Sequence, residues 1–181
     1  MFFYLAPDAL FTKIEDINGQ WLSENGIAGL IIDLDNTLAE YNQPKPPKSV
    51  ADWFNAMHKK GIGLLVLSNN REDRVASFCD GLPVEHISRA HKPRRGGYLR
   101  AAQVLGLDPA RIAVVGDQIF TDVWGARRSG MMAVCVEPIK IKGNLFYTVR
   151  RWVETPFLKL AKGGKIYAGK IRSGREQRQL P

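Results

Sequence analysis

The chain has 181 residues, of which 45% are hydrophobic, and it carries a formal net charge of +8 at pH 7. This length and apolar fraction are those of one globular domain with a sizeable core. No apolar run approaches the roughly 18 residues needed to cross a bilayer, and the two widely separated cysteines, Cys79 and Cys135, argue against a disulfide framework or a zinc site.

The first 25 residues are predicted to be helical in part and to pack on the domain, with Leu10, Ile14 and Ile17 as a buried stripe. They lack the basic residues and the long apolar stretch of a secretory signal. Because the cysteines are expected to be buried thiols, we also expect a reducing compartment, and therefore a cytosolic protein.

From residue 26 to residue 138, short apolar runs alternate with amphipathic stretches. This alternation is typical of βαβ units around a parallel sheet. The runs are almost continuously apolar, which predicts strands covered by helices on both faces. Five strands are predicted, over residues 27–33, 62–68, 84–88, 111–117 and 131–137.

Four helices are predicted between these strands. Ser49 is expected to cap the first, and Gly61 follows its end. Its apolar positions recur at helical spacing: Val50, Trp53, Phe54 and Met57. The other three are expected over about 72–80, over 96–106 and around 122–129.

Acidic and polar residues stand where three of the predicted strands end. Because the carboxyl ends of parallel strands meet at one edge of a sheet, where ligands bind, these residues are expected to converge. Clustered carboxylates repel one another, so the cluster needs a cation, and its oxygen ligands suit Mg²⁺. The residues are Asp33 and Asp35, then Ser68, Asn69 and Asn70, then Asp117 and Asp122.

A basic stretch, RAHKPRR (89–95), precedes the third predicted helix. Lys92 is expected to lie near the amino end of this helix, where a phosphate group is favoured. Arg89, Arg94 and Arg95 lie beside it in the sequence. For Arg94 and Arg95 we expect a solvated face, although their closeness to Lys92 leaves a role in substrate binding open.

Four motifs occur in a set order along the chain: D-x-D-x-T at 33–37, Ser68, Lys92, and G-D-x-x-x-x-D at 116–122. Together they resemble the haloacid dehalogenase-like phosphatases. The stretches DLDNTL, SNNREDRV, RAHKP and VVGDQIFTDVWGARRSGM look like the YqeG-like, subclass IIIA branch, which includes phosphatidylglycerophosphate phosphatases. The resemblance covers residues 4 to 140, departs at His91, where a small residue is expected, and does not extend into the tail.

The resemblance implies a three-layer, Rossmann-like α/β fold with about five parallel strands. Asp33 would be the nucleophile that forms an aspartyl-phosphate, and Asp35 the general acid and then base. Ser68 and Lys92 would hold the phosphoryl oxygens. Mg²⁺ would be held by Asp33, Asp117 and the backbone carbonyl of Asp35, with Asp122 orienting Lys92 or the metal-bound waters. Substrate would also be contacted by Thr37, Asn69 and Asn70.

Simpler structural roles compete with these assignments when each residue is taken alone. Asp35 could belong to a turn, Ser68 could cap the next helix, and Asp122 is a good helix N-cap. Together these roles leave Asp33 unexplained. The histidines show no metal-ligand spacing and are expected to be structural or surface residues: His58, His86 and His91.

Members of this family often carry a cap domain that selects substrates. Only about 30 residues separate Thr37 from Ser68, and they are filled by a proline-rich loop and one helix. We therefore expect no cap domain and an open site. An open site implies a substrate whose bulk stays outside, or a lid from another subunit; the oligomeric state is not predicted.

Residues 139–181 are predicted to form a basic tail outside the phosphatase domain of residues 1–138. Up to Pro138 there are 15 basic and 16 acidic residues, whereas the last 43 residues hold 11 basic and 2 acidic ones. An amphipathic stretch that Pro156 should kink could lie on anionic lipid or pack on the domain. Its apolar face comprises Leu145, Val149, Trp152, Val153 and Leu160.

These features favour a Mg²⁺-dependent phosphatase that acts on phosphatidylglycerophosphate at the cytosolic face of the membrane. One alternative keeps the chemistry with a soluble substrate, such as a sugar phosphate or a nucleotide. A second alternative is a scaffold or an RNA-binding module that uses the basic tail. The intact set of acids argues against a scaffold, and the absence of an RNP-like aromatic motif against RNA binding.

Overall fold

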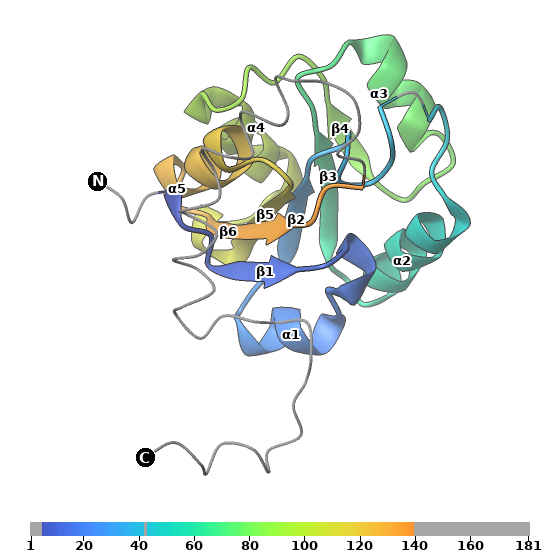
Figure 1. Cartoon of the computed structure of the whole chain (residues 1–181). Helices are drawn as coiled ribbons and strands as arrows, with labels where there is room; N and C mark the ends of the chain where they lie inside the picture. The colour runs from blue at the N-terminus through green and yellow to red at the C-terminus, as the bar shows by residue number, and fades with distance from the viewer. Residues whose placement is uncertain (1–4, 42, 140–181) are drawn as a thin grey trace, which may run out of the picture.

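The computed structural model describes residues 5–41 and 43–139. Within these residues, six parallel strands form one sheet in the order β1-β6-β5-β2-β3-β4 (Figure 1). The predicted parallel sheet is therefore confirmed, with six strands in place of about five. The strands are β1 Ala9–Phe11, β2 Gly29–Ile32, β3 Gly63–Leu67, β4 Glu85–Ile87, β5 Ile112–Gly116 and β6 Met132–Val136.

Helices cover both faces of this sheet, which gives three layers (Figure 1). The helices α1 Gly19–Glu24, α2 Lys48–Lys59 and α3 Glu72–Cys79 pack with Leu30 and Ile32 of β2 on one face. On the other face, α4 Arg95–Leu105 and α5 Trp124–Arg128 pack with Ile31. Successive residues of a strand point to opposite faces, so β2, which is apolar throughout, is buried on both sides.

The N-terminal segment differs from its prediction. Residues 9–11 form β1, a short edge strand beside β6, in place of the start of a helix. Leu10 accordingly packs toward the α4 and α5 face, whereas Ile14 and Ile17 are buried on the other face, so the three residues do not form one stripe. Helical structure begins only with the single turn Ile14–Asp16 and then α1.

Two predicted helix starts also change. Pro47, not Ser49, is the N-cap of α2, and Ser49 lies inside the helix. Asp122 does not cap α5 but lies within a π-helical turn, Ile119–Val123, that precedes it. Both cysteine side chains are buried, as predicted.

No helix among residues 5–41 and 43–139 is long and apolar enough to cross a membrane. Between β2 and β3 the structure describes loops and α2, without an inserted domain. The predicted amphipathic tail falls at residues 140–181, outside the described residues, and stays a prediction.

Candidate active site

The central strand β2 ends directly before Asp33. Its neighbours β3 and β5 are in register with it, since Ile32 lies opposite Val66 on one side and Val115 on the other. The backbone amide of Asp33 continues this ladder and donates to the carbonyl of Val115 over 2.8 Å. The Asp33 side chain is therefore held at the carboxyl edge of the sheet, where the three strands end together.

Two further aspartates reach this point from the chain that follows β5. Asp117 comes directly after the strand, and Asp122 lies in the π-helical turn. Gly116 permits the approach of Asp122, because a β-carbon at position 116 would lie 2.4 Å from Cγ of Asp122. Tyr98 of α4 supports the turn by donating from its hydroxyl to the carbonyl of Thr121 over 2.9 Å.

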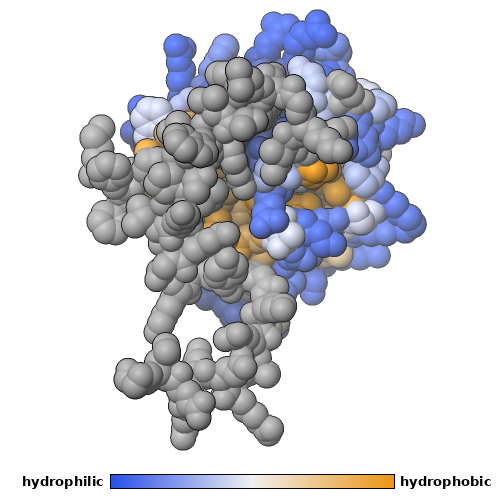
Figure 2. Space-filling model, viewed as in Figure 1, coloured by the Kyte–Doolittle hydropathy of each residue, from blue (hydrophilic) through white to orange (hydrophobic). Residues whose placement is uncertain are grey.

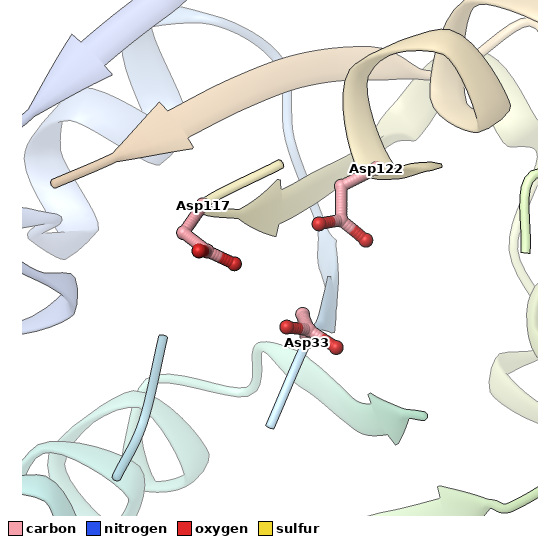
Figure 3. Close-up of side chains that lie close together, drawn as sticks. All are labelled: Asp33, Asp117 and Asp122. Carbon is pink, nitrogen blue, oxygen red and sulfur yellow. The ribbon is translucent and has the colours of Figure 1, made fainter. Parts of the chain in front are cut away.

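Figure 3 shows the carboxylates of Asp33, Asp117 and Asp122 turned toward a common space. Each offers an oxygen atom, and these three atoms lie within 4.8 Å of one another, although every one of the residues is buried. Oxygen ligands at this spacing fit a small divalent cation such as Mg²⁺. The carboxylate of Asp35 is not part of this cluster.

Lys92 places its ammonium group against the cluster, 2.5 Å from Oδ1 of Asp33 and 2.7 Å from Oδ1 of Asp122. Burial alone would lower the pKa of Lys92, but the negative charges of Asp122 and Asp33 outweigh it and hold the pKa above its ordinary value. Burial also raises the pKa of Asp122, against the positive charge of Lys92. Lys92 therefore stays charged throughout the physiological pH range.

The position of Lys92 is fixed by its backbone. Asn69, which follows Ser68 at the end of β3, accepts from the Lys92 amide over 2.6 Å and donates to the Lys92 carbonyl over 3.2 Å. The amide group of Asn69 holds this loop, and its contact with substrate stays a prediction. Its exposed side chain also lines the pocket described below.

Asp35 lines the same pocket and makes a second set of contacts. It accepts from Nδ2 of Asn70 and from the guanidinium of Arg74, each over 3.1 Å. The pKa of Asp35 is raised, mainly by burial and further by the negative charge of Asp33. The hydrogen bond from Asn70 and the positive charge of Arg74 lower it and offset part of this rise. A carboxyl whose pKa is raised in this way suits proton transfer.

The remaining predicted residues lie close by. Ser68 is buried, and its hydroxyl accepts from the Asn70 amide over 3.1 Å, so it caps a turn locally while it lines the pocket. Thr37 is buried and its hydroxyl lies 3.5 Å from Oδ2 of Asp33. Thr37 thus supports Asp33 and is not among the residues that line the pocket.

A pocket of about 260 Å³ opens in front of these residues. Four residues of this region were not predicted: Arg74, which holds Asp35, and Tyr41, Gln118 and Thr121, which line the pocket. One feature of the sequence could have indicated Arg74: it lies in the first turn of a helix that starts at the carboxyl edge of the sheet. The complete lining is Asp33, Asp35, Tyr41, Ser68, Asn69, Asn70, Lys92, Gln118 and Thr121.

Several known proteins are similar to this chain in sequence or in fold. The model of the haloacid dehalogenase-like hydrolase family matches residues 14–130. A probable phosphatase, YqeG, of Bacillus subtilis is 33% identical over 159 residues, which are 88% of this chain and 92% of that protein. The chloroplastic phosphatidylglycerophosphate phosphatase 1 of Chlamydomonas reinhardtii is 27% identical, over 80% of this chain and 55% of that protein.

Among solved structures, a putative 3-deoxy-D-manno-octulosonate 8-phosphate phosphatase from Vibrio cholerae superposes with a TM-score of 0.52. It is 17% identical, and the match covers 81% of this chain and 92% of that one. The hypothetical protein XCC2798 from Xanthomonas campestris also has a TM-score of 0.52, with 13% identity over 68% of this chain and 72% of its own. At these identities the likeness shows the fold alone.

Proposed function

This chain is a phosphatase of the haloacid dehalogenase-like hydrolase family, and we propose that it removes the terminal phosphate of phosphatidylglycerophosphate with the help of Mg²⁺. The observation that carries the proposal is the buried cluster of Asp33, Asp117 and Asp122 against Lys92, with Asp35 lining the same pocket. This arrangement supplies a nucleophile, a proton donor and positive charge in one small volume.

In the first step, a carboxylate oxygen of Asp33 attacks the phosphorus atom and the bond from phosphorus to the leaving alkoxide breaks. Asp35, protonated at the start, gives its proton to that alkoxide. In the second step, Asp35 takes a proton from water, and the resulting hydroxide attacks the phosphorus of the aspartyl-phosphate. Inorganic phosphate leaves, and Asp33 is a free carboxylate again.

Positive charge is needed because the phosphoryl group and the carboxylates repel one another. Lys92 provides a permanent charge, and its contact with Asp33 puts the ammonium where the transferred oxygens arrive. Asp33 and Asp117, with Asp122 beside them, are the proposed ligands of Mg²⁺, which when bound would add positive charge that offsets the phosphate. Ser68 is proposed to donate to a phosphoryl oxygen from the pocket wall.

The size of the pocket supports a substrate whose bulk stays outside. A volume of about 260 Å³ lies below the usual range of sites that enclose a whole ligand. It is large enough for a phosphate and a short alcohol, such as the glycerol end of the lipid. The relative from Chlamydomonas is named for the same substrate. A small sugar phosphate would also fit, so soluble substrates are the competing class.

A comparison of substrates tests this proposal. The full chain with Mg²⁺ is given phosphatidylglycerophosphate in mixed micelles, and in parallel glycerol 3-phosphate, a sugar phosphate and a nucleotide. We expect the highest kcat/KM for the lipid. A higher kcat/KM for any of the soluble esters would assign the enzyme to the soluble class instead.

A further inference from the structure

Two exposed apolar side chains lie in the pocket lining or beside the loop that carries Asp35. Tyr41, which lines the pocket, is 60% exposed, and Ile139 is 49% exposed. Ile139 reaches the active-site loop directly, because its backbone amide donates to the carbonyl of Asn36 over 3.0 Å. Both residues therefore stand at the carboxyl edge of the sheet, next to the loop that carries Asp35. Burying exposed side chains of this size against another apolar surface is favourable.

The loop that carries Lys92 also contributes to the pocket. The side chains of this loop differ in exposure. Ala90 and Lys92 are buried, whereas Arg89, Arg94 and Arg95 are exposed. The Ala90 amide donates to the Ser68 carbonyl over 2.9 Å and ties the loop to the end of β3. The loop that turns a lysine into the site thus turns arginines out to solvent at the same edge.

The charge of this loop is only partly balanced. Arg89 interacts electrostatically with Glu72. Within the part of the chain that the structure describes, neither Arg94 nor Arg95 takes part in an ion pair. Figure 2 shows hydrophilic residues over the upper right of the molecule, around α3, with a small hydrophobic area below them. Arg94 and Arg95, which have no salt-bridge partner among the described residues, therefore stand at the same edge of the sheet as Tyr41 and Ile139.

We propose that this edge of the sheet is a docking surface for an anionic lipid bilayer, with Tyr41 and Ile139 entering the interface and Arg94 and Arg95 contacting headgroups. The inference rests on the proposed function, and it adds how the site meets its substrate. Exposed apolar groups flanked by basic residues are the composition of an interfacial surface. A nucleic acid would also attract the arginines, but its bases stack on aromatic side chains and not on an aliphatic one such as Ile139.

Docking in this orientation places the pocket mouth against the bilayer. The phosphate of a lipid could then enter the pocket while its acyl chains remain in the membrane. A pocket of only about 260 Å³ without a cap is sufficient under this geometry, because the membrane itself covers the open site. The loop that carries Lys92 would thus contribute both to the site, through the buried Lys92, and to the docking surface, through the exposed Arg94 and Arg95.

Co-sedimentation of the full chain with vesicles tests the surface without reference to turnover. The anionic vesicles contain phosphatidylcholine with about 30% phosphatidylglycerol. The neutral vesicles contain phosphatidylcholine alone. The double variant Arg94→Gln/Arg95→Gln should weaken binding to the anionic vesicles roughly 10-fold. Ile139→Ser should also weaken binding to the anionic vesicles, and this loss should depend less on the salt concentration than the loss in the arginine variant. Both variants should hydrolyse a soluble phosphate ester as the wild type does.

A matched control removes two exposed charges at the opposite edge of the sheet, in Lys59→Gln/Arg111→Gln. This control should bind vesicles as the wild type does. An equal loss in the control and in the arginine variant, or no loss in either, would overturn the proposed surface. So would arginine-dependent binding to an RNA oligonucleotide that is tighter than binding to the vesicles. If the wild type binds vesicles through these residues but does not hydrolyse phosphatidylglycerophosphate, the substrate fails and the surface stands.

Discussion

The Nζ atom of Lys92 lies 2.5 Å from Oδ1 of Asp33, at a place where both side chains are more than nine-tenths buried. Oδ1 of Asp122 lies 2.7 Å from the same Nζ atom. The three charges are tolerable in the interior because each lies against an opposite charge. Lys92 therefore stabilises the fold around the acids, and we propose that it also contacts the phosphoryl group of the substrate.

Replacement of Lys92 by methionine should separate these two effects. Two buried carboxylates lose their shared partner, so the free energy of unfolding in EDTA should fall by about 3 kcal/mol. Added Mg²⁺ should restore part of this loss, because the acids would bind the ion. Urea unfolding with EDTA and with Mg²⁺ measures both effects. The exposed Lys59→Met is the control; a loss in Lys92→Met that Mg²⁺ leaves unchanged would count against a metal site at these acids.

Gly116 is expected to be intolerant of any side chain. In Gly116→Ala the new methyl group would meet the Asp122 carboxylate at 2.4 Å, so Asp122 must move and Lys92 loses its alignment. Such overpacking should cost about 1 to 3 kcal/mol of stability and most of the activity. Gly96→Ala is the matched control, since a β-carbon there meets nothing within 4 Å. Equal activity in the two variants would show that Asp122 is not held as described.

Arg74 should set the alkaline limit of activity through Asp35. As the proposed general acid, Asp35 would have to be protonated, so the rate should fall as the pH rises through its pKa. Arg74 and Asn70 lower this pKa against the effect of burial. Arg74→Met should therefore raise the pKa and move the alkaline limb of kcat/KM to higher pH. A pH profile on a soluble phosphate ester measures this, with Arg74→Lys as the variant that keeps the charge; a limb that moves to lower pH would contradict the assignment.

Cys79 should make the protein less stable in alkaline solution. Burial raises the pKa of its thiol from 9.0 to about 12. Below pH 9 the thiol is neutral in both the folded and the unfolded state, and between the two values only the unfolded state loses the proton. The free energy of unfolding should fall with rising pH in this window, by up to about 1.4 kcal/mol per pH unit from this group. Urea unfolding at several pH values should show a smaller slope for Cys79→Ala; equal slopes would contradict the shift.

Much of the fold follows from short-range patterns. The strands at 29–32, 63–67, 112–116 and 132–136 are runs of apolar residues, and they are found where these runs predict them. The strand β1 was not predicted because three residues carry too little periodicity, and its place is decided by pairing with β6. The cap of α2 was placed at Ser49 because serine is a common cap, whereas the chain uses Pro47.

The site divides in the same way. Strand ends and spacing were enough to bring Asp33, Asp117, Asp122 and Lys92 together. They could not indicate Arg74, since its contact with Asp35 joins residues 39 positions apart in the sequence. Nor could they separate the role of Asn69 as a support of the Lys92 loop from a role in binding substrate. Contacts of this kind depend on the side chains of two loops meeting, which no local pattern encodes.

In the proposed reaction, Asp33 attacks the phosphate of phosphatidylglycerophosphate. Phosphate release from this lipid in mixed micelles with Mg²⁺ is compared between the wild type and Asp33→Asn. The change keeps the size of the side chain but removes its nucleophilic charge, so we expect steady release by the wild type and a loss of at least about 1,000-fold in the variant. No release by the wild type, or full release by Asp33→Asn, would contradict the account.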